Sequence, residues 1–122
     1  MTMQRVLLGL AGLLGALGVA TAASASHATE SRNIAAIASI CLAHGPALLA
    51  VGLAGKTRAF QIAGLILAAG TVLFVADLGV REWLGRGLFP GAAPLGGGAM
   101  MAGWLALAGV GVFAGSKLFQ KD

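Results

Sequence analysis

His44 is the residue of this sequence best placed to do chemistry, because it stands inside a long apolar segment. At the helical rise of 1.5 Å per residue it lies about 16 Å into that segment, close to the middle of a bilayer. Pro46 lies two residues on, removes a backbone donor and frees a carbonyl one turn earlier. An ionisable side chain at this depth marks either a functional site or a buried hydrogen-bond partner. A proton relay or a cofactor contact is one interpretation. The one we favour is a neutral imidazole bonded to a neighbouring helix, for example to Thr71.

Asp77 and Arg81 form a second polar pair, near the end of another apolar segment. A spacing of four residues places both on one face of a helix, where pairing lowers the cost of a carboxylate near lipid. We therefore predict a structural ion pair. The alternative is an acidic group that faces an aqueous vestibule, with Glu82 and His27 on the same side as proton partners.

Few residues are suited to other kinds of chemistry. His27 lies in or beside a loop, about 15 Å from His44 along the bilayer normal, so we do not expect the two to ligate one haem iron within the chain. A haem shared with a partner stays open. Only four residues are acidic, and the single Cys41 has no partner for a disulfide or a metal site. We expect no enzyme activity, no metal and no cofactor.

The composition is typical of a protein that is embedded in a membrane. Of 122 residues, 58% are hydrophobic and 10% are charged, and the mean hydropathy is +0.92. A soluble domain usually carries about a quarter charged residues. Open strands cannot face lipid, and the alternating polar positions of a barrel are missing, so the spans are helical. We predict one all-α membrane domain over residues 1–122, a bundle of four transmembrane helices at about 5–25, 33–54, 59–80 and 97–119.

The first apolar segment also has the features of a secretory signal peptide. A short cationic start is followed by an apolar run, and Ala23-Ser24-Ala25 matches the A-x-A cleavage pattern. Cleavage would leave three spans. Because the apolar run continues to Ala25 and is long enough to cross a bilayer, we favour a retained helix.

The basic residues stand singly near the ends of the apolar segments and give a net charge of +4. They form no basic stripe, so we expect no nucleic-acid partner. Five lie on one side of the membrane and three on the other, and since Lys and Arg concentrate on the cytoplasmic face, both termini are expected in the cytoplasm. The five are Arg5, Lys56, Arg58, Lys117 and Lys121, and the three are Arg32, Arg81 and Arg86.

Small residues recur at a spacing of four in the first and fourth segments. Gly12 and Ala16 mark one face of the first helix, and Gly111 and Gly115 one face of the fourth. Such faces let membrane helices approach closely, so we predict that they pack. In the connection 81–96 we expect the prolines to interrupt helix formation, and the glycines at 96–98 to form a flexible entry into the fourth helix.

The C-terminal third carries a recognisable pattern. Pro94-Leu95-Gly96-Gly97, followed by Gly103-Trp104-Leu105, resembles the P-[IL]-G-G…G-W-L pattern of the DUF423 family. That family consists of small four-helix membrane proteins and includes the UPF0382 bacterial inner-membrane proteins and the eukaryotic transmembrane protein 256. The resemblance implies a four-helix architecture and an inner-membrane location. It carries no biochemical activity that could be transferred.

Two further elements are similar to the family and one departs from it. Gly15-Ala16-Leu17-Gly18 resembles its Gly/Ala-rich first helix, and the Ala43 to Leu48 stretch around His44 resembles its Y-H-A-L element, although this chain has no tyrosine. Val75-Ala76-Asp77 stands where the family tends to have small residues and serine.

These observations favour a non-catalytic module, either an accessory or structural subunit of a membrane complex or a homo-oligomer. Its expected partners are the lipid bilayer and other membrane proteins. Two alternatives stay open. One is a transporter-like or channel-like component that moves a proton or small solute past His44. The other is a haem or quinone contact in a respiratory-type assembly.

Overall fold

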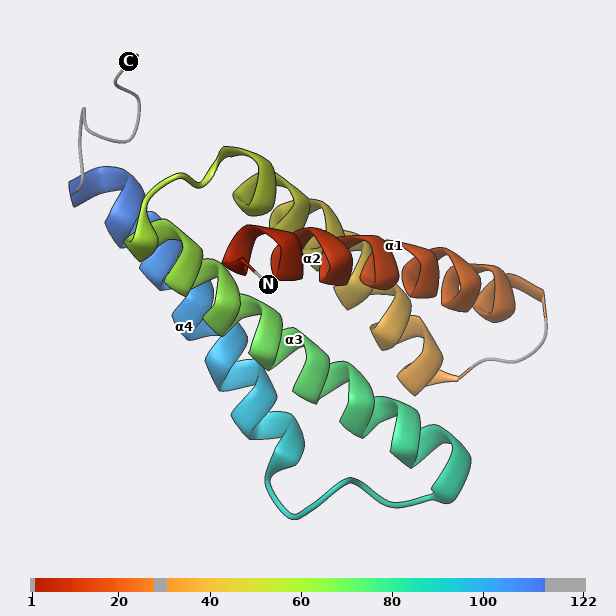
Figure 1. Ribbon diagram of the computed structural model, residues 1–122. Coiled ribbons are helices and arrows are strands. Elements are labelled where there is room, and N and C mark those ends of the chain that lie inside the picture. The colour runs from red at the N-terminus through yellow and green to blue at the C-terminus, as the bar shows by residue number, and fades with distance from the viewer. Residues whose placement is uncertain (1, 28–30, 114–122) are drawn as a thin grey trace.

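Four long helices make up nearly all of the structure, a computed structural model that describes residues 2–27 and 31–113. They are α1 (Met3–His27), α2 (Arg32–Ala54), α3 (Arg58–Leu84) and α4 (Ala92–Phe113) (Figure 1). Each has 22 to 27 residues and is apolar enough to cross a membrane. At 1.5 Å per residue that is about 33–40 Å, enough for the hydrocarbon core. The predicted all-α class with four spans is confirmed, and the described ranges contain no strand.

The helices are arranged as two antiparallel hairpins. α1 packs along α2 and α3 packs along α4, while α2 and α3 form the main contact between the hairpins. Figure 1 shows the two hairpins diverging from the short turn that joins α2 to α3. That turn spans only 55–57, which makes α2 and α3 neighbours. The centre of the bundle is filled by apolar side chains that have almost no exposed surface: Leu7, Cys41, Leu48, Leu67 and Ala68.

Side chains and a glycine set the helix ends. Ser31 caps α2 by accepting the backbone N–H of Ile34, and Thr57 caps α3 by accepting that of Phe60. Each hydroxyl satisfies a donor that the first turn of a helix leaves without a partner. α3 ends at Leu84 and is capped by Gly85, whose φ of 72° lies in the left-handed region that favours glycine.

The start of the fourth helix differs from the prediction. α4 begins at Ala92, five residues before the predicted start, and α3 continues to Leu84. Pro94 does not interrupt α4, because it lies in the first turn, where the backbone nitrogens have no carbonyl to bond within the helix. The glycines at 96–98 are helical, so the predicted flexible entry is wrong. The predicted stretch 114–119 lies outside the described residues.

Within the described part of the chain, the small residues that bring helices together are other than the predicted ones. A Cβ placed on Gly12 or Gly111 would meet nothing within 4 Å, Ala16 is exposed, and Gly115 lies outside the described residues. The close contacts are made by other glycines, and between α3 and α4 they are Gly70, Gly96 and Gly103. Small residues occur on several faces of these helices, and spacing alone does not identify the face that points inward.

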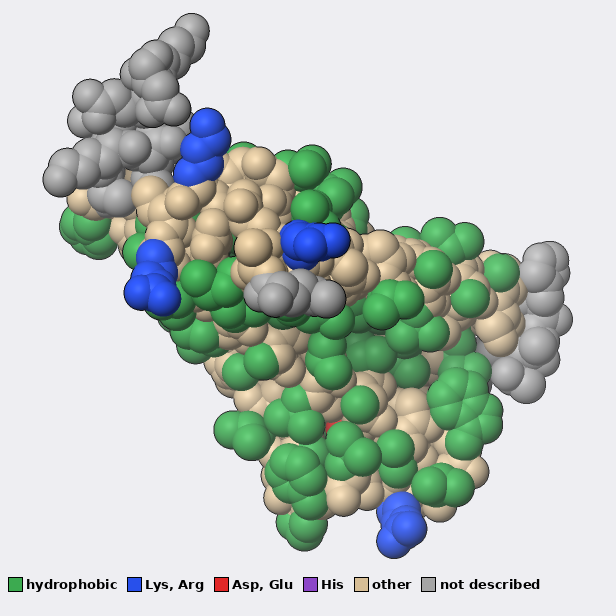
Figure 2. Space-filling model, viewed as in Figure 1, with side chains coloured by type: hydrophobic (Ala, Val, Ile, Leu, Met, Phe, Trp, Pro, Cys, Tyr) green, Lys and Arg blue, Asp and Glu red, His purple; other side chains and the backbone are tan. Residues whose placement is uncertain are grey.

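The surface between the helix ends is largely apolar (Figure 2). Basic side chains lie at or near the ends of the helices, and large apolar side chains are exposed along the helices. In water this surface would be unfavourable, but acyl chains can cover it. The distribution agrees with helices that cross a bilayer.

Candidate functional site

His44 is buried in α2, with 7% of its surface exposed, and both of its ring nitrogens are hydrogen-bonded. Nδ1 lies 2.9 Å from the carbonyl oxygen of Ile40, one turn earlier in the same helix. Nε2 accepts a hydrogen bond of 3.0 Å from the indole Nε1–H of Trp104, in α4. The two rings meet edge to face, with centroids 5.6 Å apart and an angle of 70° between their planes.

These partners fix the protonation state of the imidazole. A carbonyl oxygen only accepts and an indole N–H only donates, so Nδ1 must carry the hydrogen and Nε2 must be bare. His44 is therefore neutral, with its donor and its acceptor both used inside the chain. The expected partner was wrong in one respect, since the hydroxyl of Thr71 donates to the carbonyl of Leu67 in its own helix.

The contact between His44 and Trp104 links two helices that are otherwise apart. Among the described residues, the backbone of α4 packs against α3 and not against α2. The long indole and imidazole side chains bridge that separation. Sequence reasoning singled out Trp104 only as a motif residue. The sequence did contain a signal for this role: an indole N–H in an apolar segment needs a hydrogen-bond acceptor, and His44 is one.

Replacing Trp104 by phenylalanine should destabilise the bundle by about 0.5–1.5 kcal/mol, because His44 Nε2 then has no donor in an apolar environment. The matched control is Trp83→Phe, since Trp83 is 71% exposed and donates no hydrogen bond to the described residues. Unfolding free energies in detergent check this. Equal losses for the two variants would contradict the role given to the indole N–H.

Asp77 is the centre of a second polar cluster, at the end of α3. Its side chain is 0% exposed, and Oδ2 accepts a hydrogen bond of 2.7 Å from Nε of Arg81, so the predicted ion pair is present. Oδ1 accepts the backbone N–H of Leu88 at 2.8 Å. A Cβ on Gly87 would lie 2.6 Å from Asp77 Oδ1, so the loop after α3 folds tightly over this carboxylate. The loop contact was not foreseen.

Glu82 has a different place from the one expected. Its Oε2 accepts hydrogen bonds from the hydroxyl of Ser31 at 2.6 Å and from the amide of Asn33 at 3.3 Å. Glu82 thus joins the end of α3 to the start of α2, where a carboxylate is favoured by the helix dipole. His27 is the last residue of α1, and its side chain lies outside the described part of the structure.

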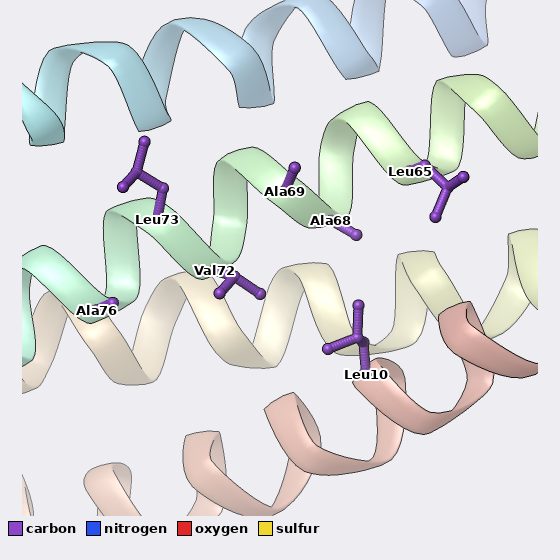
Figure 3. A pocket seen from close by; sticks show the side chains of 7 residues that line it. All are labelled: Leu10, Leu65, Ala68, Ala69, Val72, Leu73 and Ala76. Atoms are coloured by element: carbon purple, nitrogen blue, oxygen red, sulfur yellow. The ribbon is translucent and has the colours of Figure 1, made fainter. Parts of the chain in front are cut away.

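Several hollows indent the described surface. One of about 520 Å³ lies where the hairpins diverge, and Figure 3 shows Leu10 of α1 on one side of it and a row of α3 side chains on the other. The second, about 240 Å³, lies between α1 and α2 beside Gly15 and Gly45. The third, about 360 Å³, contains two arginines and lies against the loop after α3. The first two are lined by apolar side chains and glycine. The hollow of about 520 Å³ is lined by Leu10, Leu65, Ala68, Ala69, Val72, Leu73 and Ala76.

The polar clusters do not assemble into one site. His44 lies in the middle of α2, while Asp77, Arg81 and Glu82 lie at the far end of α3. Within residues 2–27 and 31–113, no three side chains of His, Cys, Asp or Glu gather closely enough to hold a metal ion. The polar contacts instead join helices at two places: His44 and Trp104 link α2 to α4, and Glu82 links the end of α3 to the start of α2.

A comparison of sequences supports the resemblance. The sequence model of a family described as a protein of unknown function (DUF423) matches residues 11–97, which is more than half of the chain. The match includes Pro94, Gly96 and Gly97 and ends before Gly103 and Trp104. No solved structure matches the chain. The chain therefore belongs to the DUF423 family, whose function is unknown, and its four long apolar helices make it a multi-pass membrane protein.

Proposed function

We propose that this protein is a non-catalytic module that assembles sideways in the membrane, with other membrane proteins or with further copies of itself. The observation that carries the proposal is a face of small residues on α1 that points away from the rest of the chain. Two other features of the described residues support it: the use of every buried polar side chain within the bundle, and the open outer side of α4.

The face on α1 is opposite the one that packs. The residues of α1 that are buried in the bundle are Leu7, Ala11, Leu14, Gly18 and Thr21. At 100° per residue, the small residues lie on the opposite side of the helix. They are exposed, and they are Gly9, Gly12, Ala16, Ala20 and Ala23. Membrane helices associate through such faces because small side chains let two backbones approach closely.

The buried polar side chains are used for structure. Thr21 and Thr71 donate to carbonyls of their own helices, and His44 and Asp77 have partners at both of their polar atoms. No buried polar side-chain atom among the described residues lacks a partner. Of these bonds, the one between His44 and Trp104 joins two helices, and the others stabilise a helix or the loop after α3. None of these side chains has a free polar atom to act on a substrate. For the same reason we prefer a structural role for His44 to a proton path.

α4 offers a second surface for assembly. It packs on α3, and its outer side exposes large apolar side chains, with Leu105 73% exposed. These side chains either face acyl chains or meet the helix of a neighbouring protein. Small residues on α1 and bulky ones on α4 give the module two outward faces of different shape.

Ala16→Leu should weaken the assembly, because a leucine in the middle of the small face holds a neighbouring helix away. Affinity purification of the tagged full-length chain from its own membranes, after mild solubilisation, would show smaller amounts of co-purifying protein or of the oligomer. The matched control is Ala50→Leu, which makes the same change at an exposed position of α2 beside the exposed Leu49 and Leu53. A wild-type chain that purifies as a monomer, with nothing bound, would rule the proposal out.

We also propose that the protein lies in the inner membrane with both termini in the cytoplasm. The support is the excess of Lys and Arg, five against three, on the side of the membrane that holds the termini. Among the described residues, Arg5, Lys56 and Arg58 lie on that side and Arg32, Arg81 and Arg86 on the other. Labelling of single cysteines at Lys56 and Arg86 in intact cells, in a chain with Cys41→Ala, would test this orientation.

A further inference from the structure

The hollow at the end of α3 differs from the other two in having cationic walls. It measures about 360 Å³ and is lined by Arg81, Arg86, Gly87, Leu88, Phe89 and Pro90. One water needs only about 15 Å³ of such space, so the hollow has room for a larger polar group. Both arginines are exposed, Arg81 to 43%.

Arg81 is held in place and still has free donors. Its Nε is bonded to Asp77, and the structure gives its two terminal nitrogens no hydrogen bond within the described residues. Arg86 likewise forms no hydrogen bond or ion pair there. A guanidinium presents a planar fork of N–H groups that matches the oxygens of a phosphate. Because Asp77 fixes one fork, less freedom is lost when an anion binds.

The charges in the hollow favour an anion with a single charge. The two guanidinium groups contribute two positive charges, and the buried carboxylate of Asp77 offsets one of them. Both oxygens of Asp77 already accept hydrogen bonds, and Asp77 does not line the hollow, so its carboxylate does not compete with an anion for the arginines' free N–H groups. The net charge of +1 complements a phosphodiester, which carries a charge of −1.

The position of the hollow at the end of α3 also fits the level of lipid headgroups. It follows the end of a membrane-spanning helix, and the aromatic side chains of Trp83 and Phe89 are exposed beside it. Aromatic rings are typical of the level at which headgroups meet hydrocarbon. Exposed Leu84 and Leu88 add apolar surface that acyl chains can cover.

We propose that this hollow binds the phosphodiester group of an anionic phospholipid, with Arg81 and Arg86 donating to its oxygens and the acyl chains lying along α3. The site is independent of the lateral assembly proposed above. The proposal also explains the fold of the loop after α3. The backbone N–H of Leu88 is bonded to Asp77, and Leu88 lines one side of the hollow.

Native mass spectrometry of the purified full-length protein tests the proposal, with phosphatidylglycerol as the probe. We expect Arg86→Gln to lower the retained phosphatidylglycerol about fivefold, the effect of one cation near an anionic lipid surface. The matched control is Arg32→Gln, which removes an exposed arginine on the same side of the membrane but outside the hollow. Because Arg86 is exposed, its variant should have an unchanged unfolding midpoint.

Two further probes separate the sources of the ligand. Diacylglycerol with the same acyl chains should not be retained, because it has no phosphate, and inorganic phosphate at equal concentration should not displace the lipid. Equal retention of phosphatidylglycerol by wild type and Arg86→Gln would overturn the proposal, as would retention of diacylglycerol. Displacement by inorganic phosphate would show that the hollow binds free phosphate and would overturn the lipid as its ligand.

Discussion

Replacing Gly96 by alanine is expected to lower the free energy of unfolding by about 1–3 kcal/mol, the usual cost of overfilling a packed interface. An added Cβ would lie 2.8 Å from the backbone nitrogen of Phe74 and 3.0 Å from the carbonyl oxygen of Gly70. These are backbone atoms of the neighbouring helix, which cannot turn aside as a side chain can. The whole of α4 has to move away from α3.

Gly70→Ala makes the same test from the other helix. Its Cβ would lie 2.6 Å from the backbone nitrogen of Met100, so a loss of similar size is expected. The matched control is Gly98→Ala, two residues from Gly96 in α4, where a Cβ meets nothing within 4 Å. The control should be neutral or slightly stabilising, since alanine favours helix more than glycine does.

Denaturant titration of the three variants in detergent provides the comparison. If Gly98→Ala is as destabilising as Gly96→Ala, the effect belongs to the helix and not to the interface between α3 and α4, and the packing described above is wrong. A loss confined to Gly70→Ala and Gly96→Ala supports it.

Arg81→Gln should cause a larger loss of stability than Asp77→Asn. The asymmetry arises because Asp77 is fully buried and Arg81 is 43% exposed. An unpaired carboxylate left inside the protein is costly, whereas an arginine without its partner can turn toward headgroups and water. The measurement is the unfolding midpoint of each variant in the same detergent.

The double variant Arg81→Gln/Asp77→Asn gives the sharper result. Removing the carboxylate as well should recover part of the stability that Arg81→Gln loses, because no charge is then buried alone. Losses that simply add would contradict the account of Asp77 as a buried charge that depends on Arg81. Glu82→Gln serves as the control, since Glu82 is hydrogen-bonded to different residues, Ser31 and Asn33.

The sequence was sufficient to predict features that depend on neighbouring residues in one helix or on the membrane as solvent. Apolar stretches of about 20 residues have to satisfy their own backbone in lipid, so helices follow from composition and length. The pair of Asp77 and Arg81 follows from a spacing of four residues on one helix. The family was recognisable from the pattern at residues 94–97 and 103–105, and the first part of that pattern lies inside the matched range.

Contacts between distant segments were decided only by the tertiary structure. Gly12 and Gly96 look alike in sequence, yet one points away from the chain and the other touches the backbone of Phe74. The partner of His44 lies sixty residues away in α4. Leu88 reaches Asp77 only because α3 ends at Leu84 and the chain folds back after the cap at Gly85. Periodicity reports the faces of each helix, but which faces meet depends on how the two hairpins pack together, and no single segment contains that information.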